Sequence, residues 1–420
     1  MFLSDQTITD IILVTLIVDF IMNYVADRLN ISRLTTHLPE KFSDVYDKKR
    51  YKQSQQYLKA TTRFGVITST IDLGILLAFW FSGGFGTLDN FVRETGWSSM
   101  GCGLLYIGVL AGCKFIISLP FSVYSTFVIE EKFGFNKTTP KLFVLDLIKS
   151  MMLSLALGIP LLSAIFWFLE STGSWAWMIC WGVTAGFILA VQYIVPSWIM
   201  PLFNKFNPLA DGELKDKLFA YAKTIDFPLT RVFVMDGSKR STKSNAFFTG
   251  FGKNKRIVLF DTLINAHTPD ELLAVLAHEM GHFKKKHIQR RLIFGILQMG
   301  VIFYLLSLFI TQQSLFTAFY VDTPSIYAGL IFFGILFSPV DLIISIIMQF
   351  FARKDEYEAD RFAALTTKKA GALITALKRL SADNLANLTP HPFYVFLNYS
   401  HPPLAQRVAA IEKIESWNGF

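Results

Sequence analysis

Long apolar segments constrain the fold of this chain more than any other feature. A helix needs about 20 predominantly apolar residues to cross roughly 30 Å of hydrocarbon. Only 17% of the 420 residues are charged, against about a quarter in soluble domains, and 52% are hydrophobic. The sequence therefore predicts an α-helical polytopic membrane protein with seven transmembrane helices, at approximately residues 8–28, 64–81, 101–127, 142–169, 175–200, 292–310 and 326–351.

The basic residues are distributed unevenly between the connecting segments. The segment 31–60 carries seven Lys and Arg, and 130–141 carries three, whereas 82–99 carries only Arg93. Cytosolic loops are enriched in Lys and Arg. The pattern thus predicts an N-terminus outside and a cytosolic C-terminus, and it explains the net charge of +8 without a nucleic-acid partner.

Residues 203–291 differ in character from the apolar segments. Residues 211–226 read as an amphipathic helix, and 231–235 and 256–260 as strands, with a shorter strand at 245–250. The following Thr268-Pro-Asp-Glu271 is typical of a capped helix start. We therefore expect a small cytosolic α+β domain in this part of the chain.

The helix that begins after Thr268 carries the motif His278-Glu279-Met-Gly-His282. Positions i and i+4 lie on one helix face, so both imidazoles can bind one metal ion. Glu279 then lies beside the metal, where it can accept a proton from water. This is the pattern of a metalloprotease helix.

A catalytic zinc has three protein ligands, so one ligand must come from elsewhere. The acidic cluster 355–360 follows the last apolar segment. Glu356 and Asp360 share a helix face, whereas Glu358 points about 200° away from Glu356. If Glu356 binds the metal, Asp360 can orient a ligand imidazole. A solvated helix end with scattered charges would show the same residues.

With these motifs the chain resembles the type I CAAX prenyl proteases, which are membrane zinc enzymes. Further similarity is carried by residues 130–137 (EEKFGFNK), 244–247 (SNAF), 254–262 (NKRIVLFDT) and 400–403 (SHPP) with Arg407. The resemblance covers essentially the whole chain. It implies an integral-membrane zinc metalloendopeptidase whose cytosolic domain is zincin-like and is completed by the C-terminal segment.

The resemblance also implies a role for each site residue. One Zn²⁺ per chain is bound by His278, His282 and Glu356, and Glu279 is the general base. His401 stabilises the oxyanion, while Asp360 and Arg407 support the ligands from outside. Asn245 and Ala246 lie on an edge strand that pairs with an extended substrate.

The implied organisation has four parts. Residues 1–202 form an N-terminal membrane domain with five spans, and 203–291 the protease segment with the H-E-x-x-H helix. Residues 292–351 form two further spans, and 352–420 carry the third zinc ligand and His401. The expected location is a bacterial inner membrane or an endoplasmic reticulum membrane, in contact with lipid.

The expected reaction is removal of the aaX tripeptide from prenylated Cys-a-a-X proteins or peptides. A quality-control protease for membrane proteins, without a prenyl requirement, is an alternative. A transporter with a vestigial metal site is a remote alternative, which acidic residues within the membrane would suit. The resemblance also implies a chamber enclosed by the spans, and the candidates for its lining are the charged residues in or near spans: Asp19, Asp72, Lys114, Asp146 and Asp341. Four histidines without partner spacing are expected at the surface: His37, His267, His287 and His391.

Overall fold

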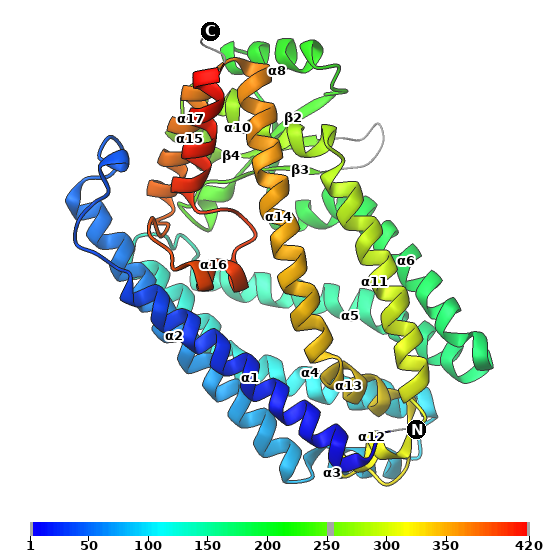
Figure 1. The fold of residues 1–420 in the computed structure, drawn as a ribbon. Helices are drawn as coiled ribbons and strands as arrows, with labels where there is room; N and C mark the ends of the chain where they lie inside the picture. Colours follow the sequence, from blue (N-terminus) through cyan, green and yellow to red (C-terminus); the bar gives the residue numbers. More distant parts are fainter. Residues whose placement is uncertain (1–2, 250–255, 418–420) are drawn as a thin grey trace.

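The computed structural model describes residues 3–249 and 256–417 (Figure 1). Within these residues, six helices are long and apolar enough to cross a membrane, and a bent helix pair makes up to seven spans. The single spans consist of α1 (Asp5–Ser32), α2 (Lys48–Phe81), α4 (Ser99–Tyr124), α5 (Pro140–Ser171), α6 (Ala176–Ile194) and α11 (His287–Phe309). The π-helix η2 (Ser125–Glu130) continues α4, and the π-helix η4 (Val195–Ile199) followed by α7 (Met200–Phe203) continues α6. The chain is thus a helical polytopic membrane protein, as the apolar segments predict.

The seventh predicted span is broken. It consists of α13 (Ile326–Leu336) and α14 (Ser338–Thr367), which meet at an angle of 53°. Pro339 lies in the first turn of α14. Proline lacks the amide hydrogen that would bond to the carbonyl four residues earlier, and its ring clashes with that carbonyl, so one helix ends here and another begins.

Two features of the helices were not predicted. The acidic cluster 355–360 does not begin a separate helix, because it belongs to the last turns of α14. The stretch between the second and third spans is not only a loop, since it contains α3 (Gly84–Glu94). Continuity of α14 means that the acidic cluster is fixed rigidly to the end of a long helix.

A four-stranded sheet lies at one end of the described structure, near the ends of α10 (Pro269–Lys284) and α14 (Figure 1). Its strands are β1 (Phe206–Pro208), β2 (Arg231–Met235), β3 (Ala246–Thr249) and β4 (Arg256–Phe260). The order is β1-β2-β4-β3; β2 and β4 are parallel, and the two outer strands are antiparallel to their neighbours. Sequence patterning predicted β2, β4 and the shorter β3 but missed β1, which has only three residues. Gly250, Asn254 and Lys255, used in the strand and motif predictions, lie outside the described residues.

Helices pack against this sheet and form a second hydrophobic core. Buried side chains of β2 and β4, such as Val232 and Ile257, pack with Leu218, Leu276 and Leu373. These leucines come from α8 (Glu213–Thr224), α10 (Pro269–Lys284) and α15 (Ala370–Asp383). The predicted capping box is present, since Thr268 and Glu271 exchange their hydrogen bonds at the start of α10. The remaining helices of the described residues are α9 (Asp261–Ala266), α12 (Gln313–Thr317), α16 (Pro392–Asn398) and α17 (Leu404–Trp417). The described residues also contain three 3₁₀ turns, η1 (Glu40–Phe42), η3 (Gly173–Trp175) and η5 (Gly237–Lys239).

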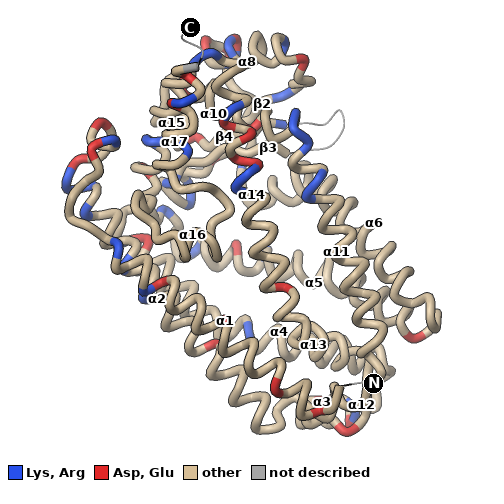
Figure 2. The backbone as a smooth tube through the Cα atoms, viewed as in Figure 1, with Lys and Arg blue, Asp and Glu red and all other residues tan. Residues whose placement is uncertain are grey.

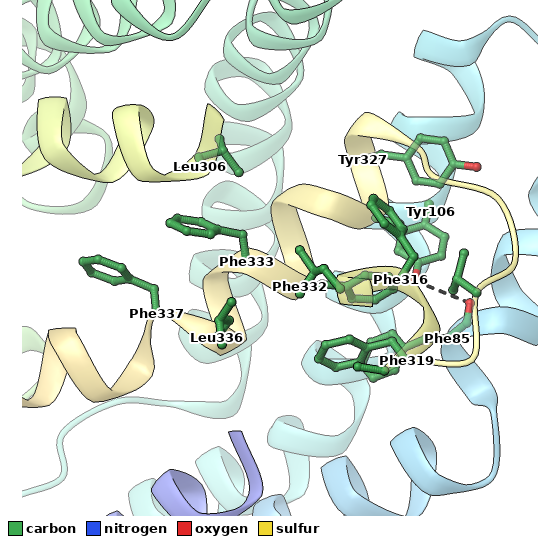
Figure 3. Packing of buried hydrophobic residues seen from close by; sticks show 14 of the residues in the cluster. Phe85, Tyr106, Leu306, Phe316, Phe319, Tyr327, Phe332, Phe333, Leu336 and Phe337 are labelled. Atoms are coloured by element: carbon green, nitrogen blue, oxygen red, sulfur yellow. Dashed lines mark hydrogen bonds between the residues drawn. The ribbon is translucent and has the colours of Figure 1, made fainter. Parts of the chain in front are cut away.

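The end of the molecule away from the sheet is held by an aromatic cluster (Figure 3). Phe319 stacks on Phe332 of α13 with ring centroids 4.2 Å apart, and Phe85 of α3 meets both rings edge-on. Gly86 lies against the carbonyl of Tyr320, where an added Cβ would come within 2.1 Å of the oxygen. Glycine therefore lets α3 approach the chain after α12.

Charged residues and apolar spans occupy different parts of the molecule. Figure 2 shows Lys and Arg gathered around the sheet, the nearby ends of α11 and α14, and the outer end of α2. The middle lengths of the long helices are mostly uncharged. The sheet and the acidic end of α14 thus lie at the basic end of the molecule (Figure 1).

Candidate metal centre

Helices α10 and α14 bring three potential metal ligands together. The Nε2 atoms of His278 and His282 are 3.1 Å apart, and Glu356 of α14 lies 3.3 Å from the first and 3.2 Å from the second. One ligand atom from each residue lies within 4.8 Å of the others, and this group is buried. The two helices approach closely because Gly281 faces Ala359, where a Cβ would already be 3.3 Å from the backbone.

The three residues fit a divalent cation. Glu356 is 3% exposed, yet its Oε2 atom has no hydrogen-bond partner among the described residues. Burying a carboxylate oxygen without a hydrogen-bond partner is costly, and a bound metal ion would give this oxygen a partner. Two imidazoles and one carboxylate are the ligand set of several catalytic zinc sites. The described part of the chain therefore contains a suitable metal-binding group.

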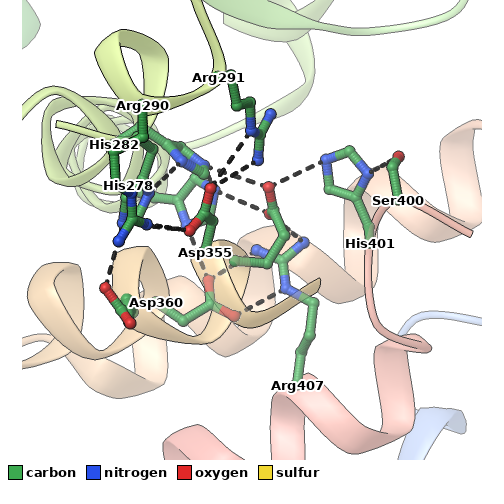
Figure 4. Close-up of polar contacts among 12 residues, drawn as sticks. His278, His282, Arg290, Arg291, Asp355, Asp360, Ser400, His401 and Arg407 are labelled. Atoms are coloured by element: carbon green, nitrogen blue, oxygen red, sulfur yellow. Dashed lines mark hydrogen bonds and ion pairs between the residues drawn. The ribbon is translucent and has the colours of Figure 1, made fainter. Parts of the chain in front are cut away.

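A second layer of charges surrounds His278. Its Nδ1 atom lies 2.8 Å from Asp360, whose two oxygens accept hydrogen bonds of 2.8 and 2.7 Å from Arg407 of α17 (Figure 4). Arg407 also lies 3.7 Å from Glu356. Burial lowers the pKa of His278, but the nearby carboxylates of Asp360 and Glu356 favour the protonated ring, outweigh burial and raise the pKa to about 9. The C-terminal helix thus completes the surroundings of a residue on α10.

This pKa leads to a prediction about metal binding. A pKa of about 9 means that at lower pH the His278 ring of zinc-stripped protein carries a second proton, on the Nε2 atom that faces Glu356, and zinc must displace this proton. We expect zinc affinity to rise about tenfold per pH unit from pH 7 to 9 and more slowly above, measured by chelator competition. A pH-independent affinity over this range would contradict the prediction.

Glu279 and His401 lie beside the three potential metal ligands. Burial raises the pKa of Glu279, against the opposing effect of the two histidines. His401 lies in the loop between α16 and α17, with its Nε2 atom 3.4 Å from Glu356 and its Nδ1 atom 2.8 Å from the Ser400 hydroxyl (Figure 4). Its side chain is 62% exposed, so it can reach a bound molecule.

Asn245 and Ala246 lie at the edge of the sheet. Ala246 begins β3, which is the last strand beyond β4 in the order of the described strands. The carbonyl of Asn245 accepts a hydrogen bond from the Phe260 amide, and its side chain accepts one from the Ala246 amide. The outer edge of β3 faces away from β4 and pairs with no described strand.

Two histidines expected at the surface are buried. His267 is 8% exposed and His287 0%. The prediction for both was wrong, because it relied on the absence of partner spacing in the sequence. His287 lies against His282, and near it Asp355 pairs with Arg290 and Arg291 (Figure 4). Asp355 belongs to the acidic cluster 355–360, but its position in that cluster did not indicate that it would lie near the histidines.

The charges predicted in or near the spans have different surroundings. Asp19, Asp72 and Lys114 line a cavity of about 870 Å³ between α1, α2, α4 and α13. Asp72 and Lys114 form an ion pair of 2.6 Å. Asp146 instead pairs with Arg240 at 2.8 Å, which ties α5 to the sheet domain, and Asp341 is exposed on α14.

Comparisons with known proteins extend over nearly the whole chain. The family described as CAAX prenyl protease N-terminal, five membrane helices, matches residues 27–205, and peptidase family M48 matches residues 208–415. CAAX prenyl protease 1 of Saccharomyces cerevisiae is 36% identical over 409 residues, covering 90% of this chain and 89% of the relative. A human CAAX prenyl protease 1 homolog is 33% identical over 434 residues, covering 92% and 90%.

A solved structure is similar throughout. The crystal structure of S. mikatae Ste24p superposes with a TM-score of 0.88 at 34% identity, covering 97% of this chain and 98% of that one. Both the membrane helices and the sheet domain therefore have counterparts in one known fold.

Proposed function

Since the chain belongs to peptidase family M48 and to the CAAX prenyl proteases within it, and is a multi-pass membrane metalloprotease, we propose that it removes the aaX tripeptide from prenylated Cys-a-a-X substrates. The observation that carries this proposal is the convergence of His278, His282 and Glu356 at the basic end of a membrane protein. Its substrates are peptides or proteins, and the prenyl requirement is the part to be tested.

One zinc ion would be held by His278, His282 and Glu356. When bound, zinc polarises the scissile carbonyl and acidifies the attacking water. Glu279 would take the proton from that water and return it to the leaving amine. Its raised pKa suits this exchange, because a general base works best when its pKa approaches the working pH.

His401 would stabilise the negative charge that develops on the carbonyl oxygen. When the Ser400 hydroxyl donates to Nδ1, the His401 proton resides on Nε2, which faces the metal ligands. That N–H would donate to the oxyanion. Preorganised donors of this kind contribute a few kcal/mol to transition-state stabilisation.

The substrate would bind as an extra strand beside β3. Its backbone would pair with the outer edge at Asn245 and Ala246, which supplies affinity without demanding particular side chains. An extended backbone also presents one peptide bond at a time to the metal.

We also propose the topology and the division into parts. The basic loops support a cytosolic zincin-like domain and C-terminus, with the N-terminus on the opposite side. The family boundary between residues 205 and 208 supports a five-span domain 1–202 followed by the protease segment 203–291, two spans at 292–351 and a C-terminal segment 352–420. Relatives in yeast and human support the endoplasmic reticulum membrane over a bacterial inner membrane.

A comparison of two peptides tests the substrate class. Purified protein in lipid is incubated with a farnesylated Cys-a-a-X peptide and with the same peptide lacking the prenyl group. We expect kcat/KM to be at least about tenfold higher for the farnesylated peptide, since a buried isoprenoid adds apolar contact area. Release of aaX is followed by mass spectrometry.

Equal rates for both peptides would contradict the prenyl requirement and favour the quality-control protease. Hydrolysis of neither peptide by protein with stoichiometric zinc would contradict the proposed substrate class.

A further inference from the structure

His287 is buried at the first position of α11, directly after the helix that carries the metal ligands. On one continuous helix, residues 282 and 287 would point about 140° apart. The helix is interrupted, however, because α10 ends at Lys284 and Lys286 adopts the left-handed conformation with φ of 59°. This turn brings the His287 ring beside His282, with centroids 5.1 Å apart.

The two rings form a hydrogen bond between their Nδ1 atoms, which are 2.9 Å apart. The Nε2 atom of His282 faces His278 and Glu356, and a metal-binding nitrogen carries no proton. His282 therefore holds its proton on Nδ1 and donates it to His287. As acceptor, His287 must hold its own proton on Nε2.

That second proton also has an acceptor. Nε2 of His287 lies 3.3 Å from Glu358 and 3.7 Å from Asp355. Asp355 is buried and is neutralised by Arg290 and Arg291, so Glu358 is the carboxylate free to accept. The order His282, His287, Glu358 forms a continuous hydrogen-bonded chain, which we call the His287 chain.

The other ligand has a different support. His278 faces the carboxylate of Asp360, whereas His282 faces a neutral imidazole. Outer partners fix the tautomer and the ring orientation of metal-binding histidines. Each of the two ligand histidines thus has an outer partner that can orient its ring, a carboxylate for His278 and a neutral imidazole for His282.

We propose that His287 is a positioning residue that fixes the tautomer and ring orientation of His282 for zinc through the His287 chain. This proposal rests on the zinc site proposed above. A buried histidine that only fills space would affect folding without affecting the metal.

Three variants separate these roles. His287→Phe removes the acceptor and fills the space, and His287→Asn keeps an acceptor near the Nδ1 position. His267→Phe is the matched control, because His267 is also buried but contacts the Leu263 carbonyl at the opposite end of α10. Each full-length protein is stripped of metal, and its zinc Kd, the visible spectrum of its Co²⁺ form and its thermal unfolding are measured.

We expect His287→Phe to raise the zinc Kd by about 10- to 100-fold and to shift the Co²⁺ bands. His287→Asn should restore most of the affinity, and His267→Phe should change neither property even where it lowers the unfolding temperature. An unchanged Kd and Co²⁺ spectrum in folded His287→Phe would overturn the proposal. An equal loss of affinity in His267→Phe would also overturn it.

If His287→Phe does not fold, Glu358→Leu decides the question, since Glu358 is partly exposed and its loss leaves the core intact. A Kd several-fold weaker supports the His287 chain, and an unchanged Kd overturns it. Wild-type protein that binds no zinc would refute the zinc site itself, which distinguishes the two failures.

Discussion

Glu279→Gln is expected to reduce kcat by about 10²- to 10⁴-fold while zinc remains bound. The amide has the shape of the carboxylate but cannot accept a proton from water. Glu279 is not among the three converging ligand residues, so the metal site should keep its composition. The measurements are single-turnover hydrolysis of the farnesylated peptide and zinc content by mass spectrometry.

Glu412→Gln provides the matched control. Glu412 is exposed on α17, and its one ion pair with a described residue is with the surface residue Lys41, an interaction worth at most about 1 kcal/mol. Its activity should equal that of wild type. Undiminished hydrolysis by Glu279→Gln would rule out the proposed base, and loss of zinc from that variant would make its low activity uninformative about proton transfer.

Glu356→Ala is expected to abolish stoichiometric zinc binding. Two imidazoles would remain where three ligands converge, and a catalytic zinc site takes three protein ligands. The loss of affinity should exceed the roughly 10- to 100-fold typical of losing an outer partner. Glu356→Gln should give the same result and shows that the cavity left by alanine is not the cause.

Glu358→Ala is the control for this prediction. Glu358 lies on another face of α14 and contacts His287 rather than the three ligands. At saturating zinc this variant should still bind one ion per chain. The reverse result, with zinc lost from Glu358→Ala and kept by Glu356→Ala, would identify Glu358 as the third ligand in place of Glu356.

Several structural elements could be predicted from neighbouring residues in the sequence alone. The capping residues Thr268 and Glu271 fix the start of α10, and the spacing of His278 and His282 puts both on one face of that helix. Apolar length identified the spans, because hydrocarbon thickness sets how many residues are needed. These properties depend on neighbouring residues, so a single sequence reveals them.

Other features could not be read from neighbouring residues. His287 was expected at the surface because its spacing from His282 is wrong for a continuous helix, and the left-handed Lys286 changes that geometry. The three-residue β1 was also not predicted, because so short a strand is recognised only by its pairing with β2. Both features depend on residues distant in the chain, because His287 contacts Glu358 and Phe206 of β1 pairs with Met235.

The sequence by itself determined that this chain spans a membrane, belongs to a metalloprotease family and carries two histidines and a glutamate on one helix. Only the tertiary structure decided how Glu356 and Arg407 meet that helix. Two membrane helices separate Glu356 from His282, and Arg407 lies on a later helix still. Contacts between such distant residues depend on the tertiary packing of α10, the end of α14 and α17, which share the second hydrophobic core, and neighbouring residues in the sequence cannot reveal that packing.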